Sequence, residues 1–156
     1  KKKFKNKYYA NENGYNSRLD EVQASILNFK LKKIDGFINK RRSLAKFYYK
    51  NLNSTNITLP KENFNCKHVY HLFTIHHPQG DLLIKKLNKH KIQTRKIYPY
   101  PIHKMKAYSK IIKNKNSLKN SEKKSKGIIC LPLYPELNRR EIVTICKVLR
   151  KLVKTI

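Results

Sequence analysis

Apolar residues in the first third of the chain recur every three or four positions, which is the spacing of one helix face. The pattern begins after Ser17, which together with Asp20 and Glu21 comes close to a capping box. It continues to about Asn53 through Leu19, Val22, Ile26, Phe29, Ile34, Phe37, Ile38, Leu44, Phe47, Tyr48 and Leu52. Gly36 allows a bend at a cost of about 1 kcal/mol relative to alanine. We therefore predict a long helix over residues 17–53.

The middle of the chain alternates extended patterns with short helical ones. Residues 68–77, 92–97 and 127–131 are rich in β-branched and aromatic side chains, so they predict three strands. Between the first two, Leu83, Ile84 and Leu87 mark the inner face of a short helix. A further short helix is expected near residues 118–125.

The end of the chain carries a second well-marked helix. Asn138 with Glu141 three positions later forms a capping pair, and one face then carries Ile142, Ile145, Leu149 and Leu152. The order of these elements predicts an α+β fold, in which a small sheet is covered by helices and preceded by a long helix.

Length and composition narrow the class of protein. A chain of 156 residues supports about one domain, and its 39% of apolar residues supply one small core. The sequence has no run of about 18 apolar residues that would span a membrane, and no apolar stretch behind its lysine-rich start that would mark a secretory signal. Three cysteines without CxxC spacing argue against a disulfide framework and a zinc ribbon. We expect a cytoplasmic protein.

The net charge of +28 raises the question of a nucleic-acid partner. Almost half of the chain is Lys, Asn, Ile or Tyr, a bias typical of an AT-rich genome, and only 7 of the 37 cationic residues are arginine. Arginine supplies the two-pronged contacts to phosphate and guanine that nucleic-acid binders favour. We therefore attribute the charge to composition and keep a basic nucleic-acid-binding module as an alternative.

Several kinds of catalytic or binding site have no support in the sequence. The six histidines show no HExxH spacing, and His68 and His71 at the first predicted strand are interpreted as packed or solvated side chains. With four glycines the chain has no phosphate-binding glycine loop. Cys130 and Cys146 fall on apolar faces and are predicted to lie in the core.

The segment from Gly14 to Ala24 is the most informative one. It places a carboxamide, Asn16, and a guanidinium, Arg18, at the start of the predicted long helix. Free amide groups and the helix dipole favour an anion there, so a phosphate site is one interpretation. The alternative is structural, with Ser17 capping the helix and Arg18 solvated, and the residues by themselves favour it.

The same segment resembles the GYNSRLDE-x-QA signature of the DegT/DnrJ/StrS nucleotide-sugar aminotransferases. Further segments match the family's patterns in order: 40–48 with its Arg-Arg pair, 68–73 (HVYHLF), 92–103 ending in YPYPIH, and 131–137 (LPLYPEL). The family is of fold type I and depends on pyridoxal 5′-phosphate (PLP). The resemblance implies a C-terminal portion of such an enzyme, built on a short, mainly antiparallel sheet.

The resemblance also implies a division of the chain. Residues 1–16 would lead in from a larger PLP-binding domain, 17–53 would form an interdomain helix, and 54–156 the small α+β domain. The lysine that holds the cofactor would lie in the larger domain, so this chain is expected to be inactive alone.

Site residues and partners follow from the same resemblance. Asn16 and Arg18 would reach across a homodimer interface to the partner's cofactor phosphate, and Tyr98 and His103 would face the sugar-nucleotide substrate. The complete enzyme would transfer an amino group from glutamate to a keto nucleotide sugar for surface polysaccharides. A further alternative is the remnant of a decayed gene.

Overall fold

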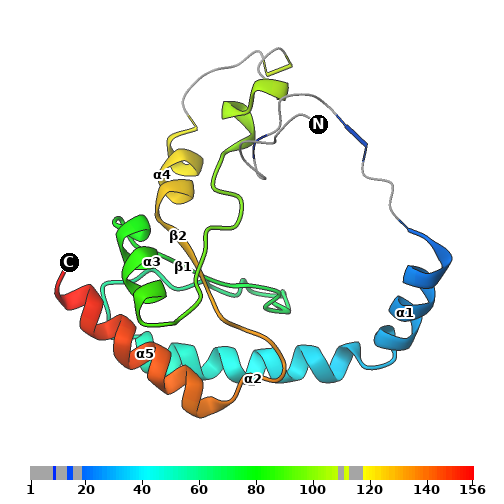
Figure 1. Ribbon diagram of the computed structural model, residues 1–156, viewed down its shortest axis with the longest axis horizontal. Helices are drawn as coiled ribbons and strands as arrows, with labels where there is room; N and C mark the ends of the chain where they lie inside the picture. Colours follow the sequence, from blue (N-terminus) through cyan, green and yellow to red (C-terminus); the bar gives the residue numbers. More distant parts are fainter. Residues whose placement is uncertain (1–8, 10–13, 16–18, 109–110, 113–117) are drawn as a thin grey trace.

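The computed structural model describes residues 9, 14–15, 19–108, 111–112 and 118–156. Two strands and two short 3-10 helices lie among five α-helices in the described part (Figure 1). The elements in order are α1 (Glu21–Leu31), α2 (Ile34–Leu52), β1 (Phe73–His76), α3 (Gly80–Lys89), η1 (Ile102–Lys104), η2 (Lys106–Tyr108), α4 (Lys119–Gly127), β2 (Ile128–Leu131) and α5 (Arg139–Lys154).

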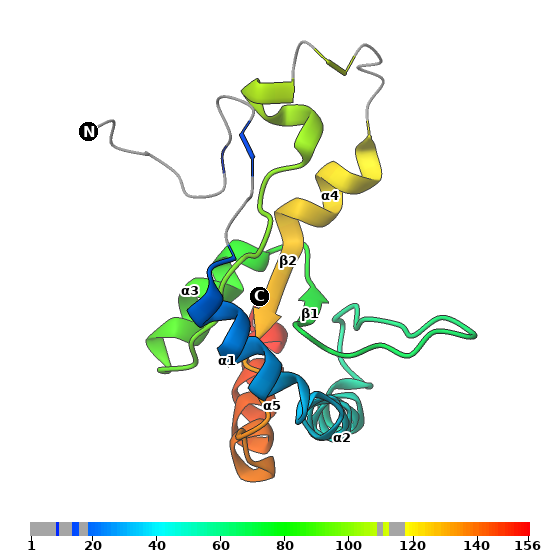
Figure 2. The same ribbon diagram turned by 90° about the vertical axis from the view of Figure 1, so that its right-hand side faces the viewer.

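The core lies between α2, α5 and the small sheet. α2 and α5 cross beneath the sheet, and α3 packs against α5 on the same side (Figures 1 and 2). The central contacts come from α2 and α5 side chains that are almost fully buried: Tyr48, Leu52, Ile142, Cys146 and Leu149. This arrangement confirms the predicted α+β class.

The last helix follows its sequence pattern closely. The Asn138 side chain accepts a hydrogen bond from the Glu141 amide, and the Glu141 carboxylate accepts one from the Asn138 amide, both at 2.9 Å. This reciprocal cap confirms the predicted start of the helix. The predicted inward face is also confirmed, since Ile142, Ile145, Leu149 and Leu152 are all buried.

The sheet has two antiparallel strands among the described residues, with Phe73 opposite Leu131 and His76 opposite Ile128. The prediction of a third strand over 92–97 was wrong, because that segment joins the sheet only through a bridge between Arg95 and Cys130. The Thr94 amide donates to the Asn88 side chain at 2.9 Å rather than to a neighbouring strand. Positive φ values of 60° at Lys91 and 58° at Tyr98 close the extended stretch on both sides.

The first strand is shorter than the predicted 68–77. Tyr70 has a φ of 48°, and its amide donates to the ring nitrogen of His68 at 2.8 Å. The Arg42 guanidinium donates to the His68 carbonyl at 2.6 Å and that of Arg41 to the Val69 carbonyl at 3.2 Å. These side-chain bonds take the groups that a strand ladder would use, so β1 begins only at Phe73.

The predicted single helix over 17–53 is divided in two. The break lies at Lys32 and Lys33 rather than at Gly36, which lies within α2. Lys33 has φ −112° and ψ 0°, and its amide donates to the Lys30 carbonyl in a tight turn. α1 begins after Asp20, whose carboxylate accepts from the Gln23 amide at 2.7 Å; the predicted cap Ser17 lies outside the described residues.

α1 contributes no side chain to the core. On the predicted apolar face, the side chains of Leu19, Val22, Ile26 and Phe29 are each more than half exposed. No residue of α1 is buried. In the described part of the chain, no helix is both long and apolar enough to cross a membrane.

The junction of α4 and β2 is a close backbone contact. A methyl group at Gly127 would overlap the ring of His76 and lie 2.5 Å from the His77 carbonyl oxygen, while one at Gly36 would meet nothing within 4 Å. Gly127 thus lets the end of α4 approach the end of β1, and Gly36 has no such role.

These two glycines form a matched pair for a stability test. We expect Gly127→Ala to lower the free energy of unfolding by about 1–3 kcal/mol, because the added methyl group forces backbone to move. Gly36→Ala should raise it by about 0.5–1 kcal/mol, because alanine suits a helix better. Urea denaturation of the full chain measures both changes, and equal effects of the two substitutions would contradict the contact at Gly127.

Candidate functional site

The segment from Tyr98 to Tyr108 forms a stiff loop on the side of the molecule away from α2 (Figure 1). Pro99 and Pro101 fix two φ angles and force the residues before them out of the helical region. Tyr98 is 74% exposed and holds a left-handed backbone conformation. The loop therefore presents an aromatic side chain to the surface on a backbone with little freedom.

His103 is held in place by a carboxylate from α4. Its Nε2 lies 3.0 Å from Oε1 of Glu122, and the Lys104 ammonium lies 3.2 Å from the same oxygen. The hydrogen bond from His103 is the main cause, and that from Lys104 the next, of a pKa of Glu122 below its usual range. Because an ionised carboxylate can only accept, Nε2 carries the hydrogen, and a neutral His103 would keep Nδ1 as an acceptor.

The loop is fastened to the body at its base as well. The Arg95 carbonyl accepts the Cys130 amide of β2 at 2.9 Å, and the Lys96 ammonium lies 2.8 Å from an Asp81 carboxylate oxygen of α3. Contacts with β2, α3 and α4 thus hold the start and the middle of the loop.

One residue near the start of the chain also touches this loop. The Tyr9 ring stands edge-on to Tyr100 with 5.7 Å between the ring centres, and its hydroxyl accepts the Lys106 amide at 3.2 Å. Asn16 and Arg18, the predicted cofactor residues, lie outside the described residues. Tyr98 and His103, the predicted substrate residues, share the one loop.

Other segments that resemble the family's sequence patterns also contact one another, and their contacts stabilise the fold. The Arg42 guanidinium pairs with both carboxylate oxygens of Glu62, at 2.9 and 3.1 Å, besides its bond to the His68 carbonyl. The Tyr48 hydroxyl donates to the Pro132 carbonyl at 2.7 Å. These hydrogen bonds join segment 40–48 to two other segments that resemble the family's patterns, 68–73 and 131–137.

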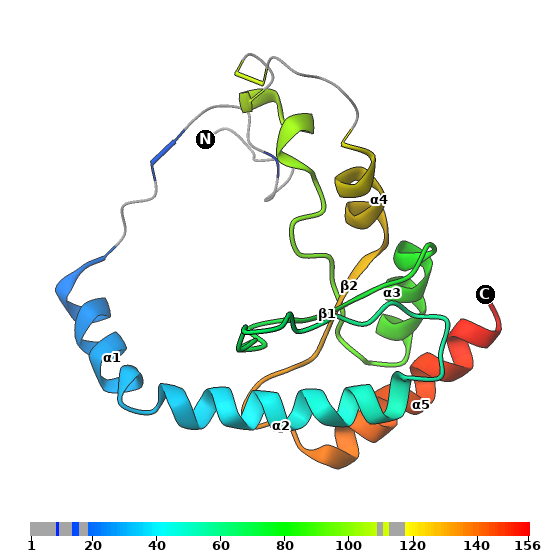
Figure 3. The same ribbon diagram turned by 180° about the vertical axis from the view of Figure 1, so that it is seen from behind.

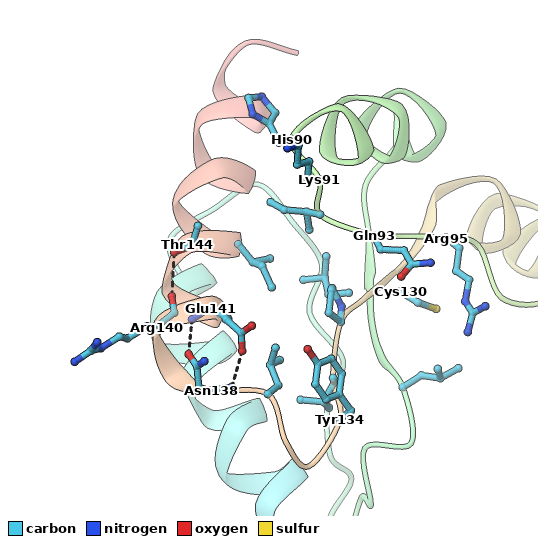
Figure 4. A pocket seen from close by; sticks show the side chains of 17 residues that line it. His90, Lys91, Gln93, Arg95, Cys130, Tyr134, Asn138, Arg140, Glu141 and Thr144 are labelled. Carbon is cyan, nitrogen blue, oxygen red and sulfur yellow. Dashed lines mark hydrogen bonds between the residues drawn. The ribbon is translucent and has the colours of Figure 1, made fainter.

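A hollow of about 720 Å³ lies elsewhere, between residues 90–95, the segment after β2 and the start of α5 (Figure 4). Neither Tyr98 nor His103 lines it. The Glu141 carboxylate at its wall already accepts a backbone amide in the α5 cap, and Arg140 points away from the other labelled side chains (Figure 4). No buried side-chain polar atom of the described residues lacks a partner, so no orphaned group marks this hollow as a site.

The remaining titratable groups of the described part form no second candidate for a catalytic or metal-binding site. Burial raises the pKa of Cys146 to about 12, with a smaller opposing effect from Arg150, so its sulfur stays a thiol. Burial, with a smaller effect from His76, lowers the pKa of His77. The described residues include no cluster of three His, Cys, Asp or Glu that could hold a metal. The predicted burial of Cys130 and Cys146 is confirmed.

The described residues do not by themselves fit PLP. An attaching lysine needs burial or a cationic neighbour to lose its proton at neutral pH, and no described lysine is buried. The predicted phosphate contacts fall on Asn16 and Arg18, outside the described part. What the described chain offers is a positioned aromatic and imidazole pair on a rigid loop.

Sequence reasoning missed Glu122 and Tyr9 as supports of this loop. Glu122 stands 19 positions after His103, beyond a lysine-rich stretch with no period. A contact of this kind has no local sequence signal, because both partners are polar and the chain between them forms no regular pattern.

Comparison with known proteins places this geometry in context. The model of the DegT/DnrJ/EryC1/StrS aminotransferase family matches residues 1–150. The dTDP-3-amino-3,4,6-trideoxy-alpha-D-glucose transaminase of Micromonospora megalomicea subsp. nigra is 35% identical over 135 residues, which cover 83% of this chain and 36% of that protein. The comparisons do not support the nucleic-acid-binding alternative.

Solved structures agree with the sequence match. Streptomyces venezuelae DesV, in complex with a ketimine intermediate, superposes with a TM-score of 0.82 at 31% identity, over 97% of this chain and 41% of that one. NtdA of Bacillus subtilis, solved with bound cofactor PMP, gives 0.71 at 30% identity, over 90% of this chain and 34% of that one. The chain thus spans about two fifths of its relatives' length. It belongs to the DegT/DnrJ/EryC1/StrS aminotransferase family.

Proposed function

We propose that this chain is the C-terminal part of a PLP-dependent sugar aminotransferase that moves an amino group from glutamate to a keto nucleotide sugar for surface polysaccharides. The observation that carries the proposal is the match of the DegT/DnrJ/EryC1/StrS aminotransferase family model to residues 1–150. The loop that exposes Tyr98 and holds His103 against Glu122 is the part of the described chain that we assign to the substrate. Relatives named as transaminases of dTDP-linked amino sugars support the substrate class. The reaction takes place in the cytoplasm.

The roles within the chain follow the predicted division. Residues 1–16 lead in from the PLP-binding domain, 17–53 connect the domains, and 54–156 form the small domain. Bound PLP supplies the electron sink for amino transfer. In a homodimer, Asn16 and Arg18 bind the cofactor phosphate of the partner subunit by hydrogen bonds and charge.

Tyr98 and His103 act on the substrate side. The exposed phenol of Tyr98 offers a flat surface and a hydroxyl to a sugar or base, and the imidazole of His103 has one nitrogen fixed by Glu122. Because the loop is already ordered, substrate binding loses little conformational entropy in it. These groups orient the substrate and do not themselves break bonds.

A chimera tests the whole proposal. Residues 14–156 replace the corresponding part of S. venezuelae DesV, and conversion of bound PLP to PMP by glutamate is followed spectroscopically. We expect conversion, and a loss of about tenfold or more in PLP affinity for Arg18→Ala, because a hydrogen bond to a charged group contributes about 1.5–3 kcal/mol. Tyr98→Ala and His103→Ala should raise the KM of the nucleotide sugar and leave PLP affinity unchanged.

The exposed Arg140 of α5 provides the control for this chimera, since Arg140→Ala removes the same charge at a residue with no proposed cofactor contact. A folded chimera that binds no PLP, or an Arg18→Ala variant as tight as the Arg140→Ala control, would contradict the proposal.

The isolated chain should lack transaminase activity. After incubation with PLP and glutamate, we expect no PMP, and borohydride reduction should leave no stoichiometric pyridoxyl-lysine in the peptide map. The reason is that no described lysine is buried, so none has the desolvated surroundings that activate a lysine for Schiff-base formation. A single stoichiometric adduct would refute this expectation.

The ion pairs of Glu122 should make stability depend on pH. Because the pKa of Glu122 is lowered in the folded chain, ionised Glu122 stabilises the fold above the ordinary glutamate value of about 4.3, and this contribution disappears as the pH falls through the lowered value. Wild type should therefore exceed Glu122→Gln in stability at neutral pH and approach it in acid. Urea midpoints across a pH series measure this, with the exposed Glu136→Gln as control; a difference independent of pH would speak against the ion pairs.

A further inference from the structure

Glu122 is an isolated acid in a strongly basic stretch of the chain. It is the only acidic residue between Asp81 and Glu136, a stretch in which lysines are frequent. The shortest of its ion-pair contacts is with a histidine, since Oε1 lies 3.0 Å from Nε2 of His103 and 3.2 Å from the Lys104 ammonium. The fold brings these groups together, because α4 stands next to the segment that carries η1 and η2 (Figures 1 and 3).

Lys104 decides which form of His103 the carboxylate stabilises. The ammonium and the imidazole share one oxygen of Glu122, so the negative charge of the carboxylate is already balanced by Lys104. A second proton on the imidazole would add a positive charge for which this described cluster holds no further negative partner. An ionised carboxylate only accepts hydrogen bonds, so the neutral ring carries its hydrogen on Nε2. Glu122 thus selects one tautomer of a neutral His103.

The other ring nitrogen of His103 is open to a ligand. The imidazole forms its hydrogen bond through Nε2, and no partner of Nδ1 lies among the described residues. In that part of the chain no buried side-chain nitrogen or oxygen lacks a partner, so Nδ1 is reached by solvent. The His103 side chain as a whole is only 14% exposed. A largely enclosed ring therefore exposes its one acceptor atom.

The helix that carries Glu122 is itself fixed to the sheet. The Gly127 carbonyl at the end of α4 accepts the His77 amide at 3.0 Å, and the Lys123 carbonyl oxygen lies 3.3 Å from Nε2 of His76. Both contacts are made at the end of β1. A residue that orients a ligand-binding side chain is most effective on such a rigid element.

We propose that Glu122 is a positioning residue, which holds His103 with its hydrogen on Nε2 so that Nδ1 accepts a hydrogen bond from a hydroxyl or amino group of the nucleotide sugar. The inference rests on the proposed function, which places His103 on the substrate side. It adds the chemical class of the group that is recognised there, a hydrogen-bond donor. Phosphate is excluded from this position, because the oxygens of an ionised phosphate only accept hydrogen bonds.

The tautomer can be measured on the full chain without any substrate. NMR spectra that correlate ring protons with ring nitrogens distinguish a protonated from an unprotonated imidazole nitrogen. In mildly alkaline solution, we expect wild-type His103 to carry its hydrogen on Nε2 alone. Glu122→Gln should introduce the form with the hydrogen on Nδ1, because a carboxamide can donate as well as accept.

The matched control is Glu136→Gln, the same chemical change at an exposed carboxylate, which should leave the wild-type tautomer. A hydrogen on Nδ1 in wild type, or the same ratio of tautomers in Glu122→Gln as in wild type, would overturn the inference.

A double-mutant cycle tests the role toward the substrate. In the chimera with S. venezuelae DesV, dTDP-3-amino-3,4,6-trideoxy-alpha-D-glucose is the amino donor that converts PLP to PMP. We expect Glu122→Gln to raise the KM of this sugar about two- to tenfold, as for the loss of one hydrogen bond, with kcat and PLP affinity unchanged. In the His103→Ala background the same substitution should have no further effect, because Glu122 acts through His103. Glu136→Gln should leave the KM unchanged.

The outcomes separate this inference from the proposed function. A chimera that makes no PMP would contradict the proposed function, and with it the substrate role of His103, even where the tautomer is as expected. A chimera that makes PMP with an unchanged KM in Glu122→Gln would overturn this inference alone. So would an equal rise of the KM with and without His103, which a purely structural role of Glu122 would give, or a loss of PLP affinity in Glu122→Gln.

Discussion

The ring of Tyr48 fixes the position of α2 against β1 and against the segment that follows β2. It is fully buried, lies parallel to Phe73 of β1 with 4.6 Å between ring centres, and donates its hydroxyl hydrogen to the Pro132 carbonyl at 2.7 Å. Burial raises the pKa of Tyr48, so the hydroxyl remains a donor. One side chain thus connects α2 to β1 and to the bend that follows β2 and leads into α5.

Local patterns in the sequence predicted the elements whose residues act through near neighbours. The cap at Asn138 and the apolar face of α5 depend on residues three and four positions apart, so the pattern contains them completely. The same holds for α3, where Leu83 and Leu87 are buried as expected and Ile84 is half-buried against the core. Extended segments were predicted less well, because Arg41 and Arg42 of α2 reach the carbonyls that a longer β1 would use.

The candidate site was predicted in part for a related reason. Two prolines made the stiffness of the Tyr98 loop visible in the sequence, but its fastening to Glu122 depends on two polar residues brought together by the fold. The resemblance to the family identified these segments but did not distinguish residues that stabilise the fold from residues that are free to bind a substrate. The structure shows that Arg42 and Tyr48 hold the body together, while Tyr98 remains at the surface.

The direct passage from α4 into β2 has a mechanical consequence. α4 ends at Gly127 and β2 starts at Ile128, so no linker separates the helix that holds His103 from the central strand. Because His103 is hydrogen-bonded to Glu122 of α4, a displacement of β2 would also displace α4 and the His103 imidazole.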